Sequence, residues 1–189
     1  MAKKRNLIEA PWYLIFDLEA TCDAGDTPAF PRDEMETIEI GAVMVSGETF
    51  EPVDEFQSFI QPVRNPVLTD FCQKLTTITQ EQVDAAPRFP EVWTAFQAWA
   101  AKYPGCCWMS WGRYDENQIR KDARFWDLQL PGGFGVFNLK AEFAKHRGIK
   151  RCGIPAALSV LGLPPMTGTH HRGIDDARNI VRILKGMQE

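Results

Sequence analysis

The chain has 189 residues, of which 44% are hydrophobic and 24% charged, and its formal net charge is −4. This length predicts one domain that can bury about 70% of the surface of the unfolded chain, a core that needs no disulfides. The composition excludes a disordered, collagen-like or coiled-coil protein. The acidic balance argues against holding nucleic acid by bulk charge alone, but it is compatible with a local site for nucleic acid.

The cysteines are odd in number and include no C-x-x-C pair, which argues against a disulfide framework or a zinc knuckle. After the basic N-terminal residues, Glu9 and Pro11 interrupt the sequence, so no signal peptide is expected, and no segment has the length of a membrane span. We therefore expect a cytoplasmic protein without a membrane partner, with a tail over residues 1–11 and a single domain over residues 12–187. The five cysteines are Cys22, Cys72, Cys106, Cys107 and Cys152.

The first strong element is the apolar run at residues 12–19, which predicts a strand buried on both faces in the middle of a sheet. Residues 37–45 and 56–60 are the next predicted strands. Their connections are too short for helical crossovers, so we expect antiparallel neighbours. Residues 106–111 form a second buried strand.

The remaining segments are predominantly helical. Thr79 and Gln82 resemble a capping box that opens a short helix to residue 85. Apolar spacing predicts further helices at residues 89–103, 114–126, 138–147, 154–161 and 174–185, with a loop at 162–173 before the last. The fold class is therefore α/β, a mixed central sheet flanked by helices.

Three places carry acidic groups suited to chemistry. Asp17 and Glu19 are two residues apart on a strand, so they project from one face. Asp115 follows the strand at 106–111, and His171 precedes Asp176 by five residues at a loop-to-helix junction. Each has an ordinary explanation when taken alone, such as a strand reaching solvent or a carboxylate at a helix N-terminus.

Together the three places suit metal-dependent hydrolysis. Carboxylate oxygens of Asp17, Glu19, Asp115 and Asp176 are the hard ligands that Mg²⁺ or Mn²⁺ prefers. Phosphodiester hydrolysis by two metal ions uses such a ligand set. His171, a histidine near its ordinary pKa, would take the proton of the attacking water.

Five stretches resemble the DEDDh exonucleases, the RNase H-like group that includes proofreading subunits and RNase T. They are closest to the Eri-type and KapD-like branch, and the resemblance extends from about residue 13 to residue 184. The stretches are FDLEATC (16–22), ETIEIGAVMV (36–45), LTDFCQKLTTIT (68–79), SWGRYDENQI (110–119) and HRGIDDARNI (171–180).

The resemblance implies an RNase H-like exonuclease fold, with three antiparallel strands first and parallel strands later. It implies a 3′–5′ exonuclease that uses two Mg²⁺ or Mn²⁺ ions per site and releases nucleoside 5′-monophosphates from RNA or single-stranded 3′ ends. It makes Asp17, Glu19, Asp115 and Asp176 the metal ligands and His171 the general base. A DNA exonuclease of proofreading or repair type and a nucleic-acid-binding adaptor are the alternatives. Because RNase T-like relatives dimerise, a homodimer also stays open.

By the same resemblance, Phe71 and Leu75 lie along the nucleotide cleft. Phe71 would stack on a terminal base, with a core position as its alternative. The backbone at Ala20 and Thr21 would contact the terminal ribose, where a 2′-OH would mark RNA. Some relatives have Trp directly before the middle aspartate, where this chain has Tyr114.

Trp111 lies three residues before Tyr114 and is the other candidate for base or sugar packing at that place. Glu39 is either a partner of the site or a residue that structures its strand. Two basic clusters would track phosphates, with a solvated face as the alternative. The clusters are Lys145, His146, Arg147, Lys150 and Arg151, and Arg120, Lys121 and Arg124.

Overall fold

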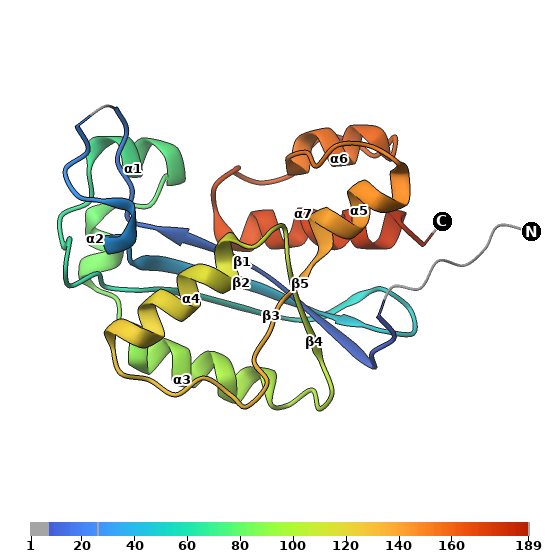
Figure 1. Cartoon of the computed structure of the whole chain (residues 1–189), viewed down its shortest axis with the longest axis horizontal. Helices are drawn as coiled ribbons and strands as arrows, with labels where there is room; N and C mark the ends of the chain where they lie inside the picture. The colour runs from blue at the N-terminus through green and yellow to red at the C-terminus, as the bar shows by residue number, and fades with distance from the viewer. Residues whose placement is uncertain (1–7, 26, 189) are drawn as a thin grey trace, which may run out of the picture.

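The computed structural model describes residues 8–25 and 27–188. Its centre is a five-stranded sheet in the order β3-β2-β1-β4-β5, drawn in Figure 1. The strands are β1 (Trp12–Ala20), β2 (Thr37–Ser46), β3 (Pro52–Phe59), β4 (Cys107–Ser110) and β5 (Phe137–Asn138). β1, β2 and β3 pair antiparallel, whereas β4 and β5 continue the sheet in parallel. The predicted mixed sheet is confirmed.

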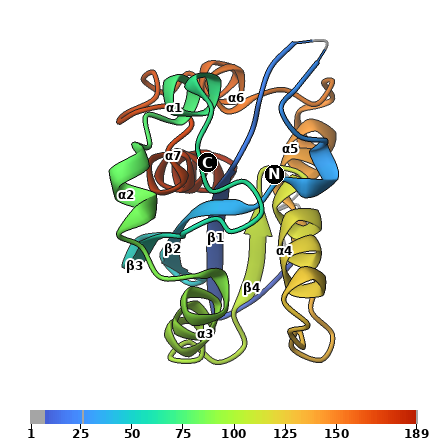
Figure 2. The same cartoon turned by 90° about the vertical axis from the view of Figure 1, so that its left-hand side faces the viewer.

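Helices cover both faces of the sheet. In Figure 2, α7 lies above the strands and α3 below them. A short 3₁₀ helix, Arg32–Glu34, precedes β2. The helices are α1 (Asp70–Thr76), α2 (Gln80–Asp84), α3 (Phe89–Ala100), α4 (Tyr114–Phe125), α5 (Leu139–Arg147), α6 (Ile154–Val160) and α7 (Gly173–Gly186).

Side chains of β1 alternate between the two faces of the sheet, and the core accordingly has two halves. Tyr13 and Ile15 point to the side of α5, α6 and α7. Leu14, Phe16 and Leu18 point to the side of α3 and one residue of α4. Because successive strand residues face opposite sides, both faces of β1 are apolar and the strand is central.

Three features differ from the sequence-based expectations. Helix α1 was not predicted; the Thr69 side chain caps it by accepting the N–H of Cys72, and Thr77 ends it in the left-handed region at φ 58°. β3 begins at Pro52 rather than residue 56, because β2 and β3 form a hairpin. β5 takes Phe137 and Asn138, so the expected helix at 138–147 begins one residue later.

The predicted tail falls partly on residues 1–7, which lie outside the described residues. Beyond them, Ile8 accepts a hydrogen bond from the Tyr13 hydroxyl at 3.0 Å, and Pro11 accepts one from the N–H of Gly47 at 2.8 Å. Residues 8–11 are therefore attached to the sheet. Across residues 8–25 and 27–188, no helix combines the length and the apolar character needed to cross a membrane.

Candidate active site

Asp17 and Glu19 lie on the face of β1 that α7 covers. Tyr13 and Ile15, at alternate positions on the same strand, belong to the core beneath α7. Glu19 is 7% exposed and Asp17 is half-buried. The two carboxylates therefore share one face, as the two-residue period of a strand requires.

The start of α7 brings a third carboxylate to this face. A Cβ on Gly41 of β2 would lie 2.0 Å from the nitrogen of Ile174, and one on Gly173 would lie 2.9 Å from the carbonyl oxygen of Asp17. Glycine at both positions allows the first turn of α7 to pack directly on β1 and β2. The carboxylate oxygens that come within 4.8 Å of one another belong to Asp17, Glu19 and Asp176.

Asp115 reaches β1 from the first turn of α4. β4 ends at Ser110, and Gly112, with φ 140°, turns the chain into the helix. The carboxylate is 3% exposed, and its Oδ1 accepts the N–H of Leu18 at 3.2 Å. Asp115 is not a member of the 4.8 Å group, but it is close enough to raise the pKa of Asp17.

A second carboxylate of α4 fixes this helix to β2. Oδ2 of Asp122 accepts the hydroxyl of Thr37 at 2.6 Å and its N–H at 3.3 Å, and Gln118 donates to the same oxygen at 3.1 Å. These bonds are buried, so they hold α4 at a fixed distance from the sheet. The position of Asp115 follows from them.

The acidic cluster disfavours its own negative charge. Burial, followed by repulsion from Asp115 and Glu19, raises the pKa of Asp17 well above its ordinary value. Burial, with repulsion from Asp176 and Glu39, raises the pKa of Glu19 to about 9. Burial raises the pKa of Asp115 to about 6. A divalent cation among these oxygens would favour the ionised forms, and carboxylates are the donors that Mg²⁺ and Mn²⁺ prefer, so the residues fit such ions.

Two adjacent histidines lie at Asp176. The backbone N–H of His171 donates to Asp176 Oδ2 at 3.2 Å, and His171 has φ 63°, in the left-handed region. Nδ1 of His170 lies 3.1 Å from both carboxylate oxygens of Asp176. The two imidazoles stack with centroids 3.9 Å apart. Burial, with repulsion from His170, lowers the pKa of His171.

His170 was not assigned a role from the sequence. Its ring, with His171 and Asp176, forms a second group whose ligand atoms lie within 4.8 Å of one another. The sequence signal for His170 is the pair of adjacent histidines, His170 and His171. Two neighbouring histidines can both reach one carboxylate when the chain turns between them. The left-handed φ of His171 produces that turn.

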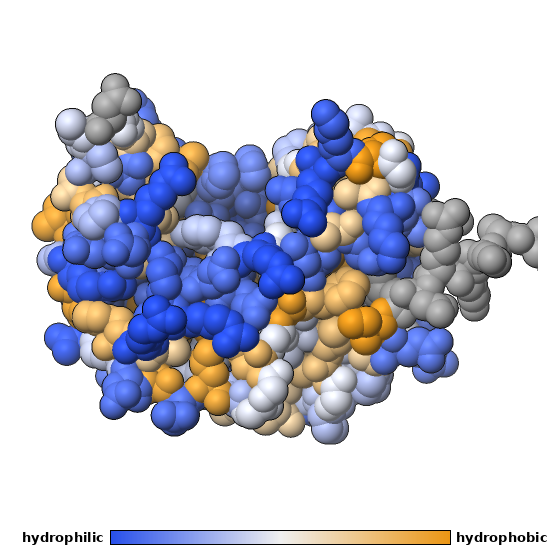
Figure 3. Space-filling model, viewed as in Figure 1, coloured by the Kyte–Doolittle hydropathy of each residue, from blue (hydrophilic) through white to orange (hydrophobic). Residues whose placement is uncertain are grey.

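The surface is hollowed on the side where the loop enters α7. Figure 3 shows the hollow between the α1 side of the molecule and the α6 side, with hydrophilic residues along its base. The loop that enters α7 borders it, as the same view in Figure 1 shows. A polymer end could therefore approach from this side.

Three predicted substrate contacts are accessible. Phe71, on α1, is 39% exposed, and Tyr114, at the start of α4, is 47% exposed. Leu75 is half-buried one turn after Phe71. Although Tyr114 is 47% exposed, desolvation of its hydroxyl, followed by repulsion from Asp115 and Glu19, raises its pKa, so the hydroxyl stays protonated.

The other three predicted contacts are buried. Thr21 is 1% exposed; its N–H donates to the Glu36 carbonyl at 2.8 Å, and its hydroxyl accepts the N–H of Glu36 at 2.9 Å. Ala20 is 4% exposed. Trp111 is 9% exposed, and its indole N–H donates to the Cys152 carbonyl at 3.0 Å. These contacts leave Trp111 a core position.

The basic clusters partly serve the fold. Arg120 donates to Glu116 at 2.8 Å and to the Phe134 carbonyl at 2.7 Å, and Lys121 donates to the Arg32 carbonyl at 2.8 Å. The Arg120–Glu116 bond lies within α4, whereas the bonds to the Phe134 and Arg32 carbonyls hold α4 to other segments of the chain. A role of these clusters in tracking phosphates stays a prediction.

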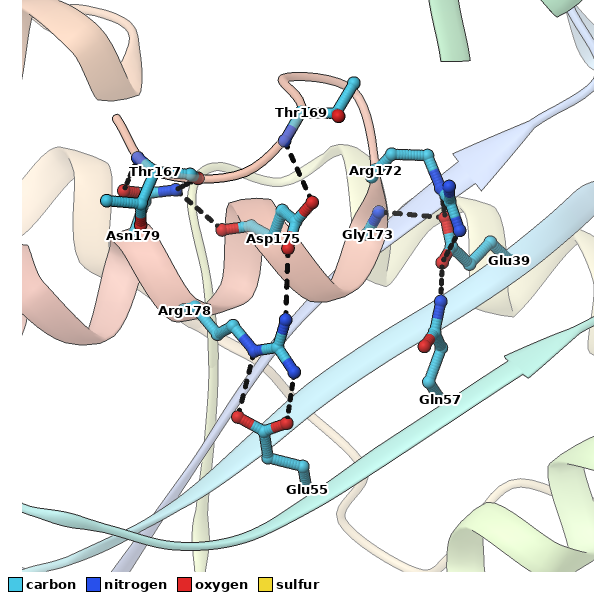
Figure 4. Close-up of polar contacts among 10 residues, drawn as sticks. All are labelled: Glu39, Glu55, Gln57, Thr167, Thr169, Arg172, Gly173, Asp175, Arg178 and Asn179. Atoms are coloured by element: carbon cyan, nitrogen blue, oxygen red, sulfur yellow. Dashed lines mark hydrogen bonds and ion pairs between the residues drawn. The ribbon is translucent and has the colours of Figure 1, made fainter. Parts of the chain in front are cut away.

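Glu39 makes the contact that sequence reasoning left open. It lies directly opposite Glu19 in the β1–β2 register and is fully buried. Its carboxylate binds Arg172 and the N–H of Gly173, at the start of α7, as Figure 4 shows. The available signal was a charged residue within an otherwise apolar strand, which must find a partner when buried.

The geometry agrees with the comparisons with known proteins. The model of a family described as Exonuclease matches residues 14–184. The chain belongs to this exonuclease family. This chain superposes on the nuclease domain of 3'hExo, described as a DEDDh family member bound to rAMP, with a TM-score of 0.86 at 30% identity. The match covers 94% of this chain and 92% of that one. The RNase H-like exonuclease fold of the DEDDh group is thereby confirmed.

Curated relatives place this exonuclease in the Eri-type branch. It is 31% identical to 3'-5' exoribonuclease 1 of Homo sapiens over 199 residues, covering 99% of this chain and 56% of the relative. It is 29% identical to the 3'-5' exonuclease eri1 of Schizosaccharomyces pombe, covering 93% of this chain and 67% of the relative. The chain thus spans little more than half the length of the human relative.

Proposed function

We propose that this chain is a metal-dependent 3′–5′ exonuclease that acts on RNA and releases nucleoside 5′-monophosphates, with residues 12–187 as the catalytic domain. The observation that carries the proposal is the convergence of Asp17, Glu19 and Asp176, whose oxygens lie within 4.8 Å of one another. Similarity to the human exoribonuclease and to the rAMP-bound nuclease domain supports RNA as the polymer.

In this proposal Asp17, Glu19, Asp115 and Asp176 would hold two ions, Mg²⁺ or Mn²⁺. When bound, such ions orient and activate the attacking water and stabilise the leaving 3′-oxygen. The protein's own contribution is a rigid ligand set. Asp176 is fixed by close packing of α7, and Asp115 is fixed by its bond to Leu18.

His171 is the proposed general base. Burial and repulsion from His170 lower its pKa, so the imidazole is neutral at pH 7 and has a nitrogen free to accept the proton of the attacking water. Its backbone N–H bond to Asp176 sets where the ring stands relative to the ligand set.

The proposed substrate contacts are accessible side chains of α1 and of the start of α4. The Phe71 ring is exposed on α1 and available to stack on a terminal base, and Leu75 and Tyr114 are the further proposed contacts. The terminal ribose would lie near the end of β1, at Ala20 and Thr21.

We place the protein in the cytoplasm. All five cysteines carry free thiols, which fits a reducing compartment.

The test uses 5′-labelled RNA and DNA oligonucleotides of one sequence, with Mg²⁺ or with EDTA. We expect stepwise shortening of RNA from the 3′ end with Mg²⁺ only, and none by Asp17→Asn. Asp33→Asn, an exposed aspartate of the 3₁₀ helix, is the matched control and should cleave as the wild type does. Equal shortening of DNA would remove the RNA preference. Absence of metal-dependent shortening of either polymer would refute the proposed exonuclease activity.

A further inference from the structure

The proposal concerns Glu39, a carboxylate of β2 outside the four acidic residues and the histidine. We propose that Glu39 is a positioning residue. It ties the loop of residues 167–172, called here the His171 loop, and the first turn of α7 to the sheet that carries Asp17 and Glu19. The inference rests on the proposed function, because it names what sets the geometry of that site.

Four donors occupy the Glu39 carboxylate. Oε1 accepts Nε2 of Gln57 at 2.6 Å and Nη2 of Arg172 at 3.3 Å. Oε2 accepts Nε of Arg172 at 3.1 Å and the N–H of Gly173 at 3.0 Å. Glu39 is 0% exposed, so water does not compete for these bonds. Both oxygens are used, which makes Glu39 an anchor rather than another metal ligand.

Glu39 also caps α7 from another element. Arg172 is the N-cap residue of the helix, but its side chain makes no capping hydrogen bond. The N–H of Gly173, in the first turn, therefore needs an acceptor from elsewhere. A buried carboxylate 134 residues away supplies it, at the end of the helix where negative charge is favourable.

Arg172 is held from two sides. Its guanidinium pairs with Glu39 and lies 5.2 Å above the ring of Phe59 on β3. Arg172 directly follows His171, whose backbone lies in the left-handed region. Fixing Arg172 and Gly173 therefore fixes where the chain leaves His171.

The other anchors of the loop come from α7 itself. Asp175 accepts the N–H of Thr169 at 2.9 Å, and Asn179 accepts the N–H of Thr167 at 3.2 Å and donates to its carbonyl at 2.8 Å. Figure 4 shows these contacts beside those of Glu39. Because they join the loop to the helix, they would move with it. The Glu39 contacts instead join the helix and loop to β2.

A second ion pair between the sheet and α7 provides the matched comparison. Glu55 of β3 binds Arg178, in the second turn of α7, at 2.5 and 3.0 Å. The Glu55 side chain is 41% exposed, and Figure 4 shows the pair apart from the contacts of Glu39. Glu55→Gln weakens this link between the sheet and α7 and leaves in place the Arg178–Asp175 pair and the bond of Asp175 to Thr169 in the loop.

The test compares Glu39→Ala and Glu39→Gln with Glu55→Gln, using two readouts on the full chain. The first is hydrogen–deuterium exchange of residues 167–173, measured without substrate. The second is single-turnover cleavage of 5′-labelled RNA at saturating Mg²⁺, with KM measured separately. Circular dichroism shows which variants fold, and Glu39→Gln, which keeps the volume and one acceptor, tests the inference where Glu39→Ala does not fold.

We expect faster exchange in both Glu39 variants and a cleavage rate lowered by about tenfold to a hundredfold, with KM little changed, since small displacements of catalytic groups cost this much. Glu55→Gln should match the wild type in both readouts. Wild-type exchange and wild-type cleavage in Glu39→Gln would overturn the inference. If the wild type cleaves no RNA, the proposed function fails, while the exchange of residues 167–173 still decides whether Glu39 anchors the loop.

Discussion

The N–H of Leu18 donates to Oδ1 of Asp115 at 3.2 Å, which joins β1 to the first turn of α4. The β1–β4 pairing extends only from Tyr13 to Ile15, so beyond it the Asp115 side chain takes the place of a neighbouring strand. The same carboxylate is thus a structural acceptor and a proposed metal ligand. Two substitutions separate these roles.

Asp115→Asn should lower the cleavage rate strongly and keep the fold. The amide oxygen can still accept the Leu18 N–H, while loss of the charge removes repulsion against Asp17. We expect a cleavage rate lowered on the order of a thousandfold, as loss of several kcal/mol of metal-assisted stabilisation implies. Asp115→Ala should also lose about 1–3 kcal/mol of folding stability, because a buried donor is left unpaired. Urea unfolding distinguishes the two, and equal stability of both variants would contradict the bond's structural role.

The pH dependence of the metal-free protein follows from the raised pKa of Glu19. Its ordinary value is 4.5 and its value in the folded chain is about 9, so between these pH values the folded state binds the proton more tightly than the unfolded state. The free energy of unfolding contributed by Glu19 is therefore full below pH 4.5 and is lost as pH rises toward 9. Asp17 acts in the same direction.

Thermal unfolding in EDTA, measured from pH 5 to pH 9, checks this. The wild type should lose Tm relative to Glu19→Gln as pH rises, and Mg²⁺ should restore more Tm at high pH than at low pH, because cations bind the ionised carboxylates. A constant difference in Tm between the two proteins across this range would show that Glu19 does not titrate abnormally.

Substitutions of His171 and of His170 should have different kinetic effects. His171→Asn removes the proposed base while tolerating the left-handed φ of 63°. We expect it to lower kcat by about a hundredfold to ten-thousandfold, the range for loss of a general base. His170→Asn should retain most activity. Because His170 lowers the pKa of His171, its removal should move the acid limb of the pH–rate profile to higher pH. A larger loss of kcat in His170→Asn would reverse the assignment.

The part of the site that follows from local periodicity could be predicted from the sequence. Asp17 and Glu19 share a face because strand residues alternate, and β1 is central because its run is apolar on both faces. The roles of Glu39 and His170 could not be predicted in this way. Glu39 meets Gly173 134 residues away, and His170 reaches Asp176 through the turn at His171. Such contacts depend on tertiary packing.

Short elements were also difficult to predict. α1 has only seven residues and depends on the cap from Thr69, and β5 has two residues that pair with the end of β4. Neither is long enough for a periodic signal. α1 matters for the proposed site, since it carries Phe71.

Gly41→Ala should disrupt the packing of α7. The added Cβ would lie 2.0 Å from the nitrogen of Ile174, a backbone atom that cannot move without shifting the helix. We expect a loss of about 1–3 kcal/mol or more in the free energy of unfolding, with lower activity because Asp176 moves with α7. Gly132→Ala is the control, since a Cβ there meets no atom within 4 Å. Equal stability of the two variants in urea would exclude close packing at Gly41.

Substitution of Phe71 should change the KM for RNA, whereas substitution of Trp111 should change folding stability. Phe71 is 39% exposed and Trp111 is 9% exposed and bonded to Cys152. Phe71→Ala should leave Tm unchanged and raise KM for RNA by about five- to 150-fold, the equivalent of the 1–3 kcal/mol of one base stack. Phe71→Trp, which keeps an aromatic face, should stay near the wild type. Trp111→Ala should instead cost about 3–5 kcal/mol of folding stability, as deletion of a buried aromatic does. A KM for Phe71→Ala equal to that of the wild type would show that Phe71 does not contact the substrate. An unchanged Tm for Trp111→Ala would show that Trp111 is not part of the core.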